Sequence, residues 1–143
     1  MIGDQIEVRG VDVVPEAVAP GGEVTVTYHF TSKKRLPAGW RLFFHLEGPR
    51  PGLFRNMDHV PVEGLMPPPR WRPGQTIRDT VHIPTSPAEP RGTYTLYVGA
   101  YRGAEHLPIS PKALVDPAGR LRVGTFEVVG GAPPLPLPKS SAR

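Results

Sequence analysis

Short runs of alternating apolar and polar residues, separated by proline and glycine, restrict the fold of this chain most strongly. The segment 23–31 alternates without a break and places Val24, Val26, Tyr28 and Phe30 on one face. A period of two puts successive side chains on opposite faces of a β-strand. The 20 prolines and 16 glycines disfavour long helices, because proline removes a backbone donor and fixes φ, and they suit turns between strands.

The same pattern recurs along the chain and predicts further strands. They cover residues 5–14, 40–47, 76–83, 92–101 and 120–129, with short additions at 60–62 and 107–109. About seven strands predict an all-β fold, an antiparallel immunoglobulin-like sandwich over residues 1–129. In residues 48–70, Pro49, Pro51 and Pro61 argue against a helix, so this segment is expected to form one long irregular loop. We expect the loop to pack against the sandwich.

Three local details refine this prediction. The alternation slips phase at Arg9-Gly10 and again at Gly124, which predicts β-bulges at both places, the second in an edge strand. The spacing Gly92-x-Tyr94-x-Leu96 is used by immunoglobulin-like sandwiches for a corner tyrosine. Its hydroxyl is expected to bond back to the preceding loop.

Residues 130–143 form a proline-rich tail or linker with Pro-x-x-Pro spacing, which an SH3-like groove could also read. No apolar run is long enough for a transmembrane segment, and no signal peptide follows Met1. We expect a cytoplasmic location if the chain is complete, and an extracytoplasmic one if it is a domain of an envelope protein. The chain has no cysteine, so thiols do not identify the compartment.

No catalytic motif is present, which predicts that the chain is not an enzyme and uses no cofactor. There is no Gly-x-Ser-x-Gly elbow and no H-E-x-x-H spacing. As an alternative, His45, Asp58 and His59 combine imidazole with carboxylate and could bind a metal or serve a small metal-dependent enzyme.

A binding surface is the favoured interpretation of the same region. Arg41, Phe43 and His45 share the outer face of one strand, with Phe54 and Arg55 above them. Such a platform suits a glycan or a protein partner, because sugars stack on aromatic rings and accept hydrogen bonds from arginine. Asp58 follows in the loop and completes the candidate set. The competing interpretation is that the loop 48–70 simply covers Phe43.

The order of four motifs resembles a known kind of module. They are F-F-H-L-E (43–47), D-H-V-P (58–61), W-R-P-G-Q-T-I-R-D (71–79) and G-T-Y-T-L-Y-V-G-A-Y (92–101). This order is similar to immunoglobulin-like accessory domains of bacterial cell-envelope proteins, among them domains that follow membrane-embedded glycosyltransferases. The chain departs from this module's pattern at Gln75, where the pattern often has an acidic residue, and at His59. The resemblance implies a non-catalytic sandwich and carries over no ligand.

Three functions follow from these observations. The favoured one is a non-enzymatic binding or structural accessory module, associated with glycans or envelope proteins. The alternatives are the metal-binding domain and a structural subunit of a larger assembly, attached through its basic surface and its tail. The net charge is +4, but basic residues are scattered apart from the run 33–35, so nucleic-acid binding is not predicted. The oligomeric state is left open.

Overall fold

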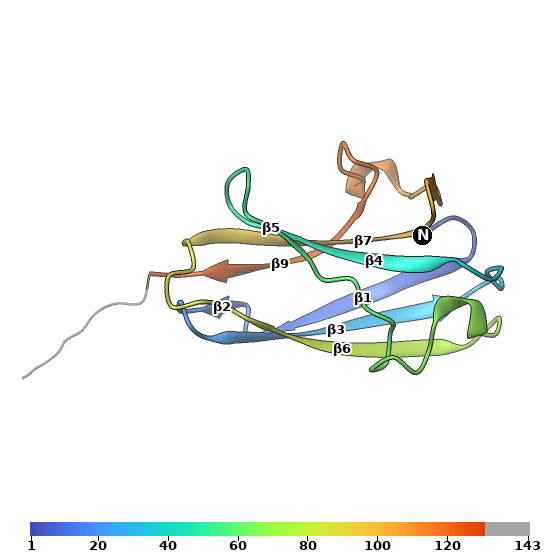
Figure 1. The fold of residues 1–143 in the computed structure, drawn as a ribbon, viewed down its shortest axis with the longest axis horizontal. Coiled ribbons are helices and arrows are strands. Elements are labelled where there is room, and N and C mark those ends of the chain that lie inside the picture. The colour runs from blue at the N-terminus through green and yellow to red at the C-terminus, as the bar shows by residue number, and fades with distance from the viewer. Residues whose placement is uncertain (131–143) are drawn as a thin grey trace, which may run out of the picture.

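A computed structural model describes residues 1–130, and in this part of the chain two β-sheets lie in two layers (Figure 1). The three-stranded sheet has the order β1 (Ile6–Val14), β3 (Glu23–Ser32) and β6 (Thr76–Pro84). The six-stranded sheet has the order β2 (Ala17–Val18), β9 (Leu121–Val128), β7 (Gly92–Arg102), β4 (Arg41–Glu47) and β5 (Phe54–Asn56), and β8 (Glu105–His106) pairs with β7.

The all-β prediction is confirmed, with one correction to the pairing. The described residues contain no α-helix and only two short 3₁₀ helices, η1 (Pro68–Arg70) and η2 (Lys112–Leu114). The fold is not wholly antiparallel, because β2 runs parallel to β9 and makes the larger sheet mixed. Pro15 and Glu16 separate β1 from β2, and there the chain passes from one sheet to the other.

The inner faces of the two sheets form the core. Val24, Val26, Tyr28 and Phe30 of β3 are all at most 2% exposed, as the alternation predicted. Trp71 is 1% exposed and lies against Phe30, with ring centroids 5.5 Å apart. β4 lies inside its sheet, as its bulky side chains predicted.

Both predicted bulges are present. The register of β1 against β3 shifts between Val8 and Gly10. The register of β9 against β7 shifts where Leu96 pairs with Gly124 and Tyr97 with Arg122, although β9 is flanked on both sides and is not an edge strand.

The short strand expected at 60–62 is wrong. Val62 and Glu63 have φ of 57° and 54°, and the Gly64 N–H donates to the Val60 carbonyl at 3.0 Å, so this segment is a turn. A positive φ is incompatible with an extended strand. At 107–109 only Ile109 makes an isolated bridge, to Ile2.

The corner tyrosine is confirmed. The Tyr94 hydroxyl donates to the Pro90 carbonyl at 2.6 Å and lies 3.0 Å from Glu89 Oε2. Burial, together with Glu89, raises the pKa of Tyr94 to about 12. This contact ties the start of β7 to the loop that precedes it.

Among the described residues, no helix has the length and apolar character that crossing a bilayer would require. The expected proline-rich tail falls on residues 131–143, which lie outside the described residues.

Candidate ligand-binding hollow

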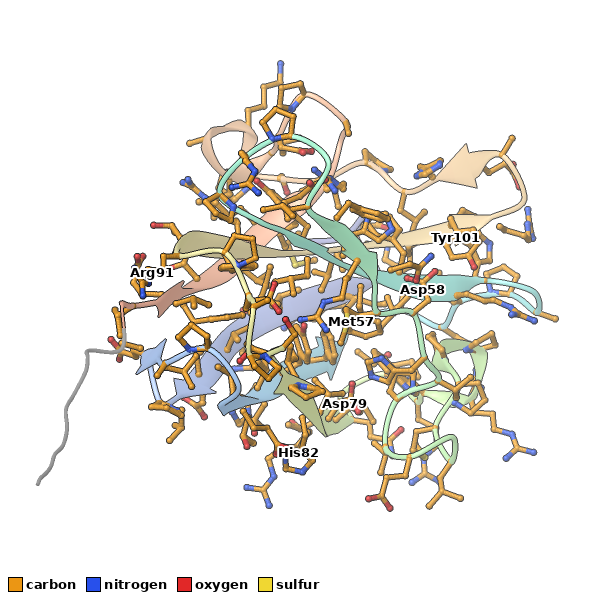
Figure 2. All side chains as sticks on the ribbon, turned by 60° about the vertical axis from the view of Figure 1, so that its left-hand side comes forward. Met57, Asp58, Asp79, His82, Arg91 and Tyr101 are labelled. Atoms are coloured by element: carbon orange, nitrogen blue, oxygen red, sulfur yellow. The ribbon has the colours of Figure 1, made fainter. Side chains whose placement is uncertain are left out.

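The outer face of β4 and β7 carries a hollow of about 390 Å³. Figure 2 labels two of its lining residues, Asp58 and Tyr101, which lie near each other beside β4. The hollow is lined by Phe43, His45, Phe54, Asp58, Tyr101, His106, Ala118 and Arg120. Its volume lies within the usual range for small-molecule sites, which is roughly 300–1,000 Å³.

Phe43 forms the floor. A Cβ added to Gly99 on the neighbouring strand would lie 2.1 Å from the Phe43 ring, so only glycine leaves room for it. Phe43 is 5% exposed, and its ring neighbours are His45, Tyr101 and His106, at centroid distances of 4.6, 6.4 and 6.1 Å. The cover therefore includes two residues from β7 and β8, and does not come from the loop 48–70 alone.

Arg120 closes one side of the hollow, and its guanidinium is held by two carboxylates. It donates to Asp116 Oδ2 at 2.6 and 2.9 Å and to Glu47 Oε2 at 3.0 Å. Its Cζ also lies 4.1 Å from the centre of the Tyr97 ring. Charge-assisted bonds of this kind are among the strongest in proteins, so Arg120 is held in one position.

Arg120 also determines the protonation of His45. Its Nη1 lies 3.3 Å from His45 Nδ1, and a guanidinium only donates, so Nδ1 must be the unprotonated acceptor. Burial lowers the pKa of His45, Asp58 opposes this, and Arg120 adds to the lowering. At neutral pH His45 is therefore neutral, with its Nε2–H on the side of Asp58.

Asp58 supplies an acceptor. Its Oδ1 accepts the Phe44 N–H at 2.8 Å and lies 4.0 Å from His45 Nε2, while its own N–H donates to Asn56 Oδ1 at 2.8 Å. Within residues 1–130 the second oxygen, Oδ2, has no hydrogen-bond partner, and the side chain is 30% exposed. The hollow thus offers a fixed donor and a fixed acceptor between aromatic rings.

Four of the six predicted binding residues line this hollow: Phe43, His45, Phe54 and Asp58. Arg55 does not, because it pairs with Leu46 and so projects from the opposite face of β5 from Phe54, and its guanidinium donates to the Pro84 carbonyl at 3.2 Å. Arg41 lines a separate groove.

Sequence reasoning missed Tyr101, His106, Ala118 and Arg120. Tyr101 could have been predicted, because it lies two residues after Gly99 on β7 and therefore shares the same face of the sheet. The other three come from segments after β7 that no periodicity connects with β4.

The predicted metal set does not assemble. His59 turns away from His45 and places its Nε2 2.5 Å from Asp79 Oδ2, under the turn 60–64. Among the described residues, no three His, Cys, Asp or Glu side chains gather as a metal site would need.

Comparisons with known proteins add little. No protein-family model matches the sequence, and no curated protein matches it. Among solved structures, one similar chain comes from work titled "AvmM Catalyzes Macrocyclization in Alchivemycin A Biosynthesis", with 13% identity, a TM-score of 0.41 and 93% of each chain covered. This neighbour is a catalyst, which contradicts the prediction that the chain is not an enzyme, and we withdraw it. At this TM-score the likeness assigns neither fold nor activity.

Proposed function

We propose that this protein is a binding module that holds a sugar ring in the hollow on the outer face of β4 and β7. The observation that carries the proposal is the convergence of Phe43, Phe54 and Tyr101 with the Asp58 carboxylate and the His45 Nε2–H. A sugar ring has an apolar C–H face that stacks on aromatic rings and hydroxyls at its edge that both donate and accept.

The polar groups fit this ligand class. Asp58 accepts from a hydroxyl and His45 donates to one, and both are positioned by bonds to other parts of the protein. Phe54 is 45% exposed at the rim and offers its ring to the ligand. Preorganised groups lose little freedom on binding, which favours affinity.

We propose further that the sandwich is immunoglobulin-like and acts as an accessory domain in a glycan or cell-envelope setting. The corner tyrosine supports the first part. The motif order over residues 43–101 supports the second.

A panel of oligosaccharides, followed by calorimetric titration of the best one, tests the proposal. Phe54→Ala and Asp58→Asn should each weaken binding by about tenfold. Asparagine keeps the oxygen that accepts the Phe44 N–H, so the fold is retained. Val14→Ala, an exposed position on the other sheet, is the control and should bind as wild type. A panel without binding, or a ligand that both variants hold normally, would contradict the proposal.

A further inference from the structure

A second recess lies beside the hollow, at the edge of β4. This groove has a volume of about 350 Å³. Its walls are Trp40, Tyr101 and the prolines of two segments, Pro61 and Pro67–Pro69, with Arg41, Leu42 and residues 58–60 completing it. Aromatic-lined grooves bind extended, proline-rich peptides in several recognition modules.

The floor of the groove is an open strand edge. β5 pairs only with His45–Glu47 of β4. Next to it, Phe44 is satisfied from the β5 side, by the Met57 N–H at 2.7 Å and by Asp58 Oδ1 at 2.8 Å. Backbone groups of residues i and i+2 in a strand point to the same side, so those of Leu42 face the groove. Within residues 1–130 they have no partner on that side.

The chain carries a segment whose chemistry matches such an edge. Residues 133–138 read P-P-L-P-L-P. If the segment is extended, Leu135 and Leu137 direct their N–H and C=O groups to one side, and the prolines, which lack an N–H, take the other. This sequence can therefore join one strand edge, but it cannot form a sheet on both of its sides.

The length of chain after residue 130 decides which copy of the protein can place this segment in the groove. Val128 of β9 pairs with Gly92, whereas the groove is lined by Tyr101 at the other end of β7; Figure 1 shows β9 ending at the opposite end of the molecule from the start of β4. The nine residue-to-residue steps from Gly92 to Tyr101 along β7 span about 30 Å. From residue 130 to Leu137 the chain spans at most about 25 Å. A copy cannot place these leucines in its own groove.

We propose that Leu135 and Leu137 of one copy add as a short strand to the open β4 edge of a second copy. The inference is independent of sugar binding. It gives the tail a partner of defined chemistry, a second copy of this chain.

Sedimentation of the full chain over a wide concentration range tests this contact. Wild type should self-associate. Leu135→Pro/Leu137→Pro removes both N–H donors and should weaken association by about tenfold or more. The control Leu135→Val/Leu137→Val keeps the donors and should associate like wild type. Both changes lie outside the described residues, and urea unfolding of each variant serves as the control for its fold.

A variant on the groove side completes the test. Val60 lines the groove and is 40% exposed, so Val60→Lys should fold and should also weaken association. Mixing Val60→Lys with the double proline variant restores one intact groove and one intact tail, and should restore a complex. A monomeric wild type, or association that the proline variant leaves unchanged, would overturn the proposal. Loss of association in the valine control would also overturn it, because hydrogen-bond donors would then not be the cause.

Discussion

Asp79 gives the sharpest prediction about stability. Its side chain is 1% exposed, and its two oxygens hold the turn 60–64 against β6. Oδ1 accepts the Val62 N–H at 2.9 Å, and Oδ2 lies 2.5 Å from His59 Nε2. His59 Nδ1 is 2.9 Å from the Met57 carbonyl, which only accepts. Both imidazole nitrogens must therefore carry protons to satisfy a carboxylate at Asp79.

The pH dependence follows from that charge. Burial disfavours the positive charge on His59, but the bonds to Asp79 and Met57 and the nearby carboxylates favour it. Together they raise the pKa of His59 above 6.5. A raised pKa means that the stabilisation is complete below pH 6.5 and is lost as the pH rises through the folded-state pKa.

Two substitutions separate the effect of the Asp79 charge from the effect of its side-chain shape. Asp79→Ala removes one partner of a largely buried pair and should cost about 3 kcal/mol at pH 6, the lower end of the usual range because His59 is partly exposed. That corresponds to a fall in Tm of about 10 °C. Asp79→Asn should cost about 1 kcal/mol, because the amide can accept from Val62 and donate to a neutral His59.

Urea unfolding of wild type and Asp79→Asn between pH 5.5 and 9 is the assay. Titration of groups elsewhere in the molecule is shared by both proteins and cancels in the difference. The difference should be largest at the acidic end of this range and should shrink as the pH rises through the folded-state pKa of His59. A difference that stays constant across this range would refute the charged pair.

Three further outcomes are expected. Tyr94→Phe should lower the free energy of unfolding by about 1–2 kcal/mol, measured in urea, because the partly buried Pro90 carbonyl loses its donor; an unchanged midpoint would contradict the corner contact. Gly99→Ala should cost about 1–3 kcal/mol by overpacking against Phe43 and should also weaken sugar binding; normal binding would show that Phe43 is not the floor. Because burial lowers the pKa of His45, binding should be constant above pH 6.5 and should fall only at lower pH, as a titration series will show; loss of binding between pH 7 and 8 would contradict a neutral His45.

Alternation predicted the strands, because inward and outward residues differ so clearly in β3 and β7. Local rules also predicted both bulges and the hydroxyl contact of Tyr94, since each depends on neighbouring residues. The parallel pairing of β2 escaped prediction because two residues carry too little pattern.

The site was predictable only in part. Phe43 and His45 share a face that the strand period defines, whereas Phe54 falls in the segment predicted as a loop. Arg120 reaches His45 across 75 positions of sequence. His59 was grouped with His45 because the two are near in sequence. A signal for its true partner was present: Asp79 shares a face with Ile77 and Ile83, and a carboxylate buried there needs a partner.

The most direct test of the central claim is a chemical-shift titration of the isotope-labelled protein with the best-binding oligosaccharide. The account predicts that the shifts cluster at Phe54, Asp58, Tyr101 and His106, around the hollow. Shifts confined to the outer face of β3 and β6, or no shifts at saturating sugar, would contradict a sugar site on β4 and β7.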